Sequence, residues 1–399
     1  MQLTNRQLFQ QNLALPAEVP NALEIVYAEG IYLTDINGDR YIDLVSGVSV
    51  SNIGHRHPKV IQAVEQQMGK YMHLMVYGKY IQSPQVQLAG ALATVLPESL
   101  RSVFMVNSGS EAIEGALKLA KRSTGRTEIV AFENAYHGST HGALSVLGNE
   151  EMKSAYRPLL PDIKFCGFND PEMFTSITER TACVIVEPIQ AEAGIIIPDK
   201  GWIKKLRSRC TDTGTLLIFD EVQMGFGRTG KLMAFENFEI VPDILCLAKG
   251  MGGGMPIGAF VASRELMNLL TFNPALGHIT TFGGHPVCAA AALASLEVIL
   301  NEGLSLQAEL KGKQFVRLLE KHPMVAEIRQ IGLMLAVEIV PGFQVSKLVK
   351  ILQKNRLIVD QFLFNSTSFR IAPPLTITNE EITEAATLVI KSLNELKIS

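Results

Sequence analysis

The chain has 399 residues, of which 47% are hydrophobic and 19% are charged, proportions typical of soluble globular proteins and not of disordered ones. Its formal net charge of -3 at pH 7 excludes a strongly basic surface for nucleic acid or an anionic membrane, so neither partner is expected. The length predicts two domains, and no apolar run is long enough to span a membrane.

The cysteines and the first residues indicate a reducing compartment. No cysteine forms a C-x-x-C pair, and most lie in apolar stretches where cysteine acts as a small core residue. Residues 1–7 lack the apolar segment of a secretory signal. We therefore expect a cytoplasmic protein. The cysteines are Cys166, Cys183, Cys210, Cys246 and Cys288.

The N-terminal region, from roughly residue 20 to 45, is expected to contain a β-hairpin. Residues Ile31–Thr34 and Tyr41–Leu44 alternate between apolar and polar side chains, as paired strands do. The Asn37-Gly38-Asp39 sequence between them is typical of a tight turn.

The middle of the chain alternates between short apolar runs, which predict buried strands, and helical patterns. Helical spacing of apolar residues predicts helices over Lys59–Met68, Glu111–Arg122 and Trp202–Thr211. This alternation predicts a mostly parallel sheet covered on both faces. The expected strands are Val103–Val106, Ile129–Phe132, Ile163–Phe168, Cys183–Val186, Thr215–Phe219, Ile244–Ala248 and Gly258–Ala262.

The C-terminal part has a different pattern, in which a long Ala/Leu-rich helix after about residue 290 precedes short strands and a final helix from Asn379. We predict an α/β protein in which residues 49–288 form a large, mostly parallel sheet domain. Residues 1–48 and 289–399 would together form a small α+β domain. The strands expected near the C-terminus are Met334–Ile339, Leu357–Val359 and Phe369–Ala372.

Four predicted strands end in polar residues that contrast with the apolar run before them. One leads into residues 107–110 (Asn-Ser-Gly-Ser), and the other three lead into Glu187, Asp220 and Lys249. Ligands bind beyond the carboxyl ends of parallel strands, so these groups are expected to meet in one crevice. Each strand could also simply stop at a turn, but the four together favour an active site.

Residues 107–110 open directly into an amphipathic helix, which suits an anion. Free N–H groups and the positive end of the helix dipole attract a phosphate, and the Ser110 hydroxyl adds a donor. The alternative is that Ser108 or Ser110 only caps the helix, and the sequence leaves both open.

Lys249 and Asp220 indicate covalent cofactor chemistry. A lysine at the end of a buried strand loses hydration, which lowers its pKa toward the range useful for a Schiff base. Asp220 would suit a protonated pyridine nitrogen. The alternatives are a structural lysine and a metal-binding pair of Asp220 and Glu221, for which no suitably spaced histidine or third carboxylate is present.

Two motifs point to other chemistries but lack the context that these need. Gly225-Phe-Gly-Arg-Thr-Gly230 matches the dinucleotide pattern G-x-G-x-x-G, yet it does not lie between a strand and a helix. His137 and His141 have the spacing of zinc hydrolases, but the motif lacks the general-base Glu and contains Gly138. We expect neither a nicotinamide or flavin nor a metal.

Together these segments resemble the class III aminotransferases, which include the acetylornithine, ornithine and 4-aminobutyrate enzymes. The resemblance covers nearly the whole chain and is most specific over residues 216–230 and 243–250. It implies the PLP-dependent transferase fold (fold type I), pyridoxal 5′-phosphate (PLP) as cofactor, and a homodimer with active sites at the interface. Other matching segments are Leu33–Asp43, Gly54–Pro58, Ala135–Gly138, Val186–Gln190, Thr280–Gly284 and Phe369–Pro374.

The resemblance also implies residue roles toward the cofactor. Lys249 would hold PLP covalently and move the proton, while Asp220 would pair with the ring nitrogen. Tyr136 would stack on the ring and Gln223 would contact its hydroxyl. Thr281 would reach the phosphate from the partner subunit. The remaining cofactor-binding positions would be Ser108, Gly109, Ser110, His137, Glu187 and Thr280.

On the substrate side, the resemblance implies that Arg370 grips the α-carboxylate, with Glu187 as its acidic partner and Val48 nearby. The chain departs from the family at Ser139, where many members have an arginine for the distal carboxylate of glutamate. Use of 2-oxoglutarate would then need another cation, such as Arg157.

We therefore expect an aminotransferase that moves an amino group from an amine or amino acid, with an N-acylornithine-like donor as one candidate, to a 2-oxo acid. The alternatives are a PLP-dependent racemase or aminomutase on the same fold, or a non-catalytic binding protein. The last would have no need of an intact Lys249 and phosphate loop.

Overall fold

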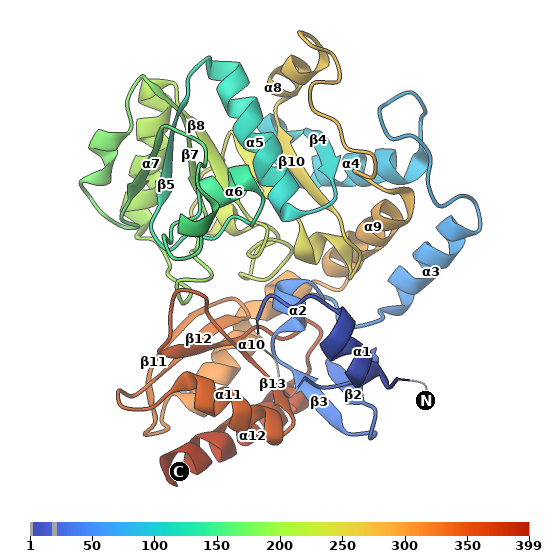
Figure 1. The fold of residues 1–399 in the computed structure, drawn as a ribbon, viewed down its shortest axis with the longest axis vertical. Coiled ribbons are helices and arrows are strands. Elements are labelled where there is room, and N and C mark those ends of the chain that lie inside the picture. Colours follow the sequence, from blue (N-terminus) through green and yellow to red (C-terminus); the bar gives the residue numbers. More distant parts are fainter. Residues whose placement is uncertain (1–2, 18–21, 399) are drawn as a thin grey trace.

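A computed structural model describes residues 3–17 and 22–398. Residues 1–2 and 20–21, which belong to the N-terminal segments discussed above, lie outside the described residues. Figure 1 shows a large sheet in the upper part of the molecule and two smaller sheets below it, where both chain ends also lie. We call these parts the large lobe and the small lobe.

The large lobe is built on a seven-stranded sheet in the order β4-β10-β9-β8-β7-β5-β6. All neighbouring strands are parallel except β10, which runs antiparallel to β4 and β9. The strands are β4 (Ser102–Val106), β5 (Glu128–Phe132), β6 (Ile163–Cys166), β7 (Thr181–Val186), β8 (Leu216–Asp220), β9 (Ile244–Leu247) and β10 (Gly258–Ala262).

Both faces of this sheet are buried, because successive strand residues enter different core clusters. In β7, Cys183 and Ile185 pack in one cluster with α5, whereas Val184 and Val186 pack in the other with α7 and α9. The helices of this lobe are α3 (Pro58–Met68), α4 (Ser83–Val95), α5 (Gly109–Thr124), α6 (His141–Ser145), α7 (Lys200–Thr213), α8 (Arg264–Asn268) and α9 (Pro286–Asn301).

The small lobe joins both ends of the chain. Strand β13 near the C-terminus pairs in parallel with β3 near the N-terminus. Its sheets have the orders β1-β2-β3-β13 and β11-β12-β15-β14. Their strands are β1 (Ile25–Glu29), β2 (Tyr32–Asp35), β3 (Arg40–Asp43), β11 (Val325–Ile331), β12 (Met334–Ile339), β13 (Leu357–Ile358), β14 (Asp360–Gln361) and β15 (Ser368–Ile371). The remaining helices are α1 (Asn5–Asn12), α2 (Ser46–Ser49), α10 (Leu304–Leu319), α11 (Val345–Lys354) and α12 (Asn379–Ile398).

The predicted architecture is confirmed: the fold is α/β, with a mostly parallel sheet and a smaller α+β part made from both chain ends. The expected hairpin is β2 and β3, which pair through the predicted turn. All seven strands expected in the middle of the chain form one sheet. The division at residues 48 and 288 stays a prediction.

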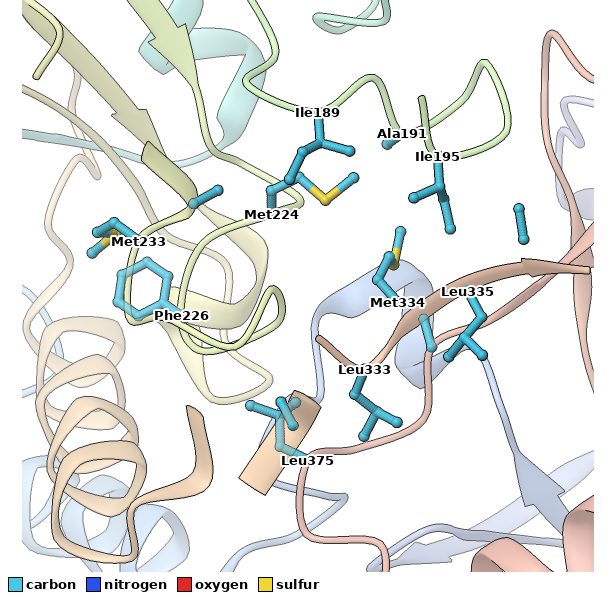
Figure 2. Close-up of a cluster of buried hydrophobic side chains, with 14 of the residues drawn as sticks. Ile189, Ala191, Ile195, Met224, Phe226, Met233, Leu333, Met334, Leu335 and Leu375 are labelled. Atoms are coloured by element: carbon cyan, nitrogen blue, oxygen red, sulfur yellow. The ribbon is translucent and has the colours of Figure 1, made fainter. Parts of the chain in front are cut away.

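One hydrophobic core continues between the two lobes. Figure 2 shows this cluster, in which Phe226 and Met224 from the loop after β8 lie with Leu333, Met334 and Leu375 of the small lobe. The position of the loop after β8 is therefore coupled to the small lobe by packing.

No single helix within residues 3–17 and 22–398 is long and apolar enough to cross a membrane. Within the same described residues, the bent pair of α9 and α10 alone passes such a test on length and composition, and most of α9 is buried inside the protein.

Candidate active site

A cavity of about 450 Å³ lies beyond the carboxyl ends of β4, β7, β8 and β9. The four polar groups that follow these strands all reach it, although they are far apart in the sequence. The described residues that line it are Val50, Asn107, Ser108, Gly109, Ser110, Tyr136, His137, Gly138, Glu187, Glu192, Asp220, Val222, Gln223, Ala248, Lys249, Gly254, Met255, Pro256 and Ile257.

The start of α5 forms one end of the cavity. Ser108 is the N-cap, and its hydroxyl accepts a hydrogen bond from the Glu111 N–H at 3.2 Å. The capping alternative therefore describes Ser108, whereas Gly109 and Ser110 form the first helical turn beside the cavity. A Cβ added at Gly138 would lie 2.1 Å from the Ser110 Oγ, so only glycine fits there. This end is shaped for an anion.

His137 and Asp220 form a buried pair that lines the cavity. The Nδ1 of His137 lies 2.7 Å from the Asp220 Oδ2, and the Asp220 Oδ1 accepts from the Val222 N–H at 3.0 Å. The His137 Nε2 is buried without a hydrogen-bond partner among the described residues. Asp220 is thus oriented by two donors while its carboxylate still borders the cavity.

Glu187 also lines the cavity, but its partners are backbone groups. Its carboxylate accepts the backbone N–H groups of Tyr136 and Ala191, each at 3.0 Å. Burial raises the pKa of Glu187 to about 7. Its carboxylate is therefore occupied in fixing the loop that carries Tyr136.

Lys249 stands at the end of β9 in a strained backbone conformation, with φ at 45°. Burial lowers the pKa of its amine. No hydrogen bond or ion pair of this amine exists within the described part of the chain, although it lines the cavity with Asp220 and Glu192. Such an amine is suited to nucleophilic or proton-transfer chemistry.

The expected pairing of Arg370 with Glu187 is wrong. Both oxygens of Glu192 accept from the Arg370 Nη2, each at 2.7 Å, and Arg370 is fully buried. The carboxylate of Glu187 is held by the two backbone N–H groups instead. Nε and Nη1 of Arg370 are buried and have no partner among the described residues, so the guanidinium keeps free donors.

Glu192 was missed by the sequence analysis, although a signal was present. It is the one acidic residue in the apolar stretch Ile189–Ile195 that follows Glu187. An acid in such a loop next to a crevice is a candidate for a buried ion pair.

The other substrate position also needs a correction. Val50, and not Val48, lines the cavity, because α2 is kinked, with positive φ angles at Gly47 and Val48.

Four further positions lie outside the cavity. Thr281 is exposed, and the Thr280 hydroxyl accepts from the Asn107 side-chain amide at 2.8 Å. Ser139 is exposed, with its hydroxyl 3.3 Å from that of Tyr136. Arg157 is exposed and paired with Glu150, so this chain does not bring it to the cavity.

The two misleading motifs have structural positions. Gly225–Gly230 is a loop that no helix follows directly, and His141 is exposed at the start of α6. Within residues 3–17 and 22–398, no group of three His, Cys, Asp or Glu side chains is placed to hold a metal ion.

The cavity fits a flat ring that carries a phosphate. The start of α5, the carboxylate of Asp220 oriented by His137, and the unpaired amine of Lys249 all line this one cavity. A Cβ at Gly109 would lie 2.8 Å from the Val222 side chain, so the walls are closely packed. The orphaned Nε2 of His137 adds a donor or acceptor at the buried end.

Comparison with known proteins identifies the family of the chain. The sequence profile of that family, described as "Aminotransferase class-III", matches residues 15–393. An acetylornithine aminotransferase of Methanopyrus kandleri is 40% identical over 363 residues, which cover 90% of this chain and 92% of that protein. A LysW-aminoadipate semialdehyde/glutamate semialdehyde transaminase of Sulfolobus acidocaldarius is 37% identical over 94% of this chain and 96% of its own length.

Solved structures agree. The ornithine aminotransferase of Toxoplasma gondii superposes with a TM-score of 0.90 at 30% identity, covering 98% of this chain and 94% of that chain. The fold is thus the PLP-dependent transferase fold of type I expected from the sequence.

Proposed function

The chain belongs to the class-III aminotransferases, and from that membership we propose a PLP-dependent enzyme that transfers an amino group from an amine or amino acid to a 2-oxo acid. One observation carries the proposal about the site. Lys249, Asp220 and the start of α5 border the same cavity of about 450 Å³. The N-acylornithine-like donor remains a candidate because acetylornithine aminotransferases are among the relatives.

PLP, when bound, would supply an electrophilic carbon and a ring that withdraws electrons from the substrate. Lys249 would hold it through its amine, and Gly109, Ser110 and the helix dipole of α5 would hold the phosphate. Asp220 would keep the ring nitrogen protonated, with His137 orienting its carboxylate. Tyr136 and Val222, which both line the cavity, would enclose the ring, and Gln223 would contact its hydroxyl.

Lys249 would also move the proton. Its lowered pKa leaves more of the amine neutral near pH 7, so it can accept a proton from the substrate carbon and return it elsewhere. No second lysine lines the cavity among the described residues, so no other lysine amine is placed for this proton transfer.

Arg370 would bind the substrate carboxylate with the donors that Glu192 leaves free. Glu192 would occupy the guanidinium whenever a substrate without that carboxylate is bound. The ion pair supports a site that handles both ω-amines and α-amino acids in the two halves of one reaction.

We further propose a homodimer. The loop between α3 and α4 and the loop between α8 and α9 enclose a second cavity of about 560 Å³ with apolar walls. Exposed apolar side chains surround it, which monomers rarely leave uncovered. Thr281 on this surface would contribute to the partner's phosphate site. The exposed side chains are Met72, Leu74, Met75, Tyr80, Ile81, Phe272, Leu276, Ile279 and Phe282; we call them the loop surface.

A reducing, cytoplasmic compartment is also proposed. All five cysteines are buried and unpaired, a state that suits a compartment where thiols are kept reduced. Fractionation of the source cells with an antibody to the protein would test this, and recovery from an oxidising compartment would contradict it.

The decisive test is a half-reaction. Purified protein reconstituted with PLP is mixed with single amine donors, and the absorbance of the bound cofactor is followed. We expect a donor to convert the cofactor to its amine form without an acceptor, and Lys249→Ala to abolish turnover. If no donor in a broad panel converts the cofactor, transamination is wrong, and a racemase or aminomutase takes its place.

A matched control is Lys153→Ala. Lys153 is also a buried lysine with a pKa lowered by burial, but it donates to the Leu147 carbonyl at 2.8 Å, outside the cavity. We expect this variant to keep its turnover. If Lys249→Ala also kept its turnover, the proposed role of Lys249 would be refuted. If wild type itself showed no turnover, a non-catalytic binding protein would be favoured.

A further inference from the structure

Arg228 is a fully buried arginine in the loop after β8, at 0% exposure. Its guanidinium donates to four oxygens, none of which belongs to a carboxylate in the part of the chain that the structure describes. Burial lowers the pKa of Arg228 to about 9, an effect that the nearby charge of Asp43 offsets only in part. Burial of Arg228 therefore lowers the stability of the fold. The hydrogen bonds of its guanidinium indicate which segments the residue holds in place.

The four acceptors come from segments that are far apart in the sequence. Nη1 donates to the carbonyls of Leu333 at 3.0 Å and Pro373 at 2.5 Å, in the C-terminal part. Nη2 donates to the Asn52 amide oxygen at 2.6 Å and the Ser46 hydroxyl at 3.3 Å, in the N-terminal part. The planar guanidinium therefore joins the loop after β8 to the N-terminal and C-terminal parts of the chain, and its rigid geometry fixes the directions of the hydrogen bonds.

One side of this network reaches Lys249. The Asn52 side chain donates to the Phe226 carbonyl at 3.0 Å, and a Cβ at Gly250 would lie 2.5 Å from its Nδ2. Asn52 thus packs directly against the residue that follows Lys249.

The other side reaches Arg370. Pro373 lies two residues beyond Ile371, the end of β15, and Arg370 is on that strand. The Ser46 hydroxyl donates to the Ala372 carbonyl at 2.7 Å, which fixes the same strand end. Figure 2 shows apolar side chains of the same segments, with Phe226 on one side and Leu333 and Leu375 on the other.

We infer that Arg228 is a positioning residue that sets the place of Arg370 relative to Lys249, and so determines how well a substrate carboxylate is gripped while its amine lies at the reacting end. This rests on the proposed function. Displacement of a binding group by a fraction of an ångström is costly only for substrates that use that group. Arg228 should therefore matter for amines that carry an α-carboxylate and not for amines that lack one.

The experiment compares Arg228→Lys and Asn52→Ala with wild type in the PLP-loaded enzyme, using L-alanine and ethylamine as donors. These donors differ only in the carboxylate. We expect the kcat/KM of the half-reaction to fall about tenfold or more for L-alanine, through a higher KM, and to change less than about twofold for ethylamine. The Asn52 variant keeps the assay usable if the Arg228 variant does not fold.

A binding measurement accompanies the kinetics. Propionate carries the carboxylate but cannot react, and its Kd is measured by calorimetry. We expect the Kd to rise about tenfold in Arg228→Lys. The matched control is Arg126→Lys, because Arg126 also ties carbonyls of separate segments, those of Thr181, Thr213 and Gly214, but only within the large lobe. That control should lower the Tm but leave unchanged the kcat/KM for both donors and the Kd of propionate.

Equal losses for L-alanine and ethylamine, or an unchanged propionate Kd in both variants, would overturn the inference and leave Arg228 a structural residue. Absence of propionate binding to wild type would overturn it too. A wild type that binds propionate but reacts with no donor would instead refute the proposed function, and the propionate comparison would still decide the inference.

Discussion

At the residue scale, the ionisation of a buried carboxyl depends on the balance between lost water and donated hydrogen bonds. Glu221 is fully buried beside Asp220, and its two oxygens accept the N–H groups of Ala234 at 2.5 Å and Phe235 at 2.7 Å. Burial dominates and raises the pKa of Glu221 to about 8. This acid therefore keeps its proton in the folded enzyme at neutral pH.

The first prediction concerns the pH dependence of stability. Between the value of 4.5 that Glu221 has when unfolded and its folded pKa of about 8, only the folded state holds this proton. Unfolding then releases a proton, so Glu221 lowers the free energy of unfolding by about 1.4 kcal/mol per pH unit as pH rises. We expect Glu221→Gln to remove this fall between pH 5 and 8, as measured by urea unfolding.

The control for that measurement is Glu239→Gln. Glu239 is exposed, and its hydrogen bond with Lys204 lowers its pKa, so this change should leave the slope above pH 5 as it is in wild type. If the slope of Glu221→Gln equals that of wild type, the two N–H bonds keep the Glu221 carboxylate ionised and the argument from burial is wrong.

A second prediction concerns the amino acceptor. Among the described residues, Lys249 is the only cationic side chain that lines the cavity, and Arg370 lies behind Glu192. A dicarboxylic acid therefore lacks a partner for its distal carboxylate. We expect Ser139→Arg to improve kcat/KM for 2-oxoglutarate roughly tenfold, since a hydrogen bond to a charged group contributes about 1.5–3 kcal/mol.

Pyruvate is the internal control for this change, because it has no distal carboxylate and its kcat/KM should stay within about twofold of wild type. An equal gain for both acceptors would indicate a general effect on the site. No gain for 2-oxoglutarate would count against this account of position 139.

Residue identities at the strand ends were predictable, whereas pairings across the cavity were not. Asp220 and Lys249 stand out because a polar residue after an apolar run has few other reasons to be there. The choice between Glu187 and Glu192 as the partner of Arg370 depends on which carboxylate the backbone N–H groups of Tyr136 and Ala191 occupy. This depends on the tertiary structure and cannot be predicted from the spacing of residues in the sequence.

At the scale of elements, the start of α5 and the loop that carries Gly138 form one unit. Gly138 has a φ of +124°, and its Cα approaches Ser110 so closely that a Cβ would lie 2.1 Å from the hydroxyl oxygen. The loop thus fixes the direction of the Ser110 side chain at the end of the cavity proposed for the phosphate.

The third prediction follows from that contact. Gly138→Ala should displace the Ser110 hydroxyl and strain the loop by about 1–3 kcal/mol, which we expect to weaken PLP binding about tenfold in equilibrium dialysis. Gly125→Ala is the matched control, because Gly125 ends the same helix at a φ of +66° but has nothing within 4 Å. Equal affinity of the two variants for PLP would contradict the proposed unit.

Elements that the sequence analysis left out share a physical reason. Helix α10 presents exposed leucines, including Leu306 at 74% and Leu310 at 69%, which obscure its amphipathic pattern. Strand β14 has only two residues and is set by its pairing with β15. Buried strands of the large sheet were predicted because burial on both faces leaves continuous apolar runs.

At the scale of the whole molecule, the loop surface lies at one side of the large lobe, where the loop between α3 and α4 meets the loop between α8 and α9 (Figure 1). Ile81 is 93% exposed there. In the same two loops the rings of His73 and His285 stack, and the ring of Phe282 lies tilted against both. Nδ1 of each histidine is buried without a partner among the described residues. Such atoms find partners when a second subunit covers them.

The last prediction tests that assembly. Burial of an isoleucine contributes about 2 kcal/mol, and a two-fold interface counts it twice, so Ile81→Lys should shift wild-type dimers to monomers in analytical ultracentrifugation at micromolar concentration. PLP should then be lost more readily, because Thr281 would no longer reach the partner's site. Leu306→Lys replaces a similarly exposed residue on α10, away from the loop surface, and should leave a PLP-retaining dimer. An Ile81→Lys variant that stays dimeric would contradict the proposed interface. A monomer, wild type or Ile81→Lys, that retains PLP as well as a dimer does would show that each active site is complete within one chain.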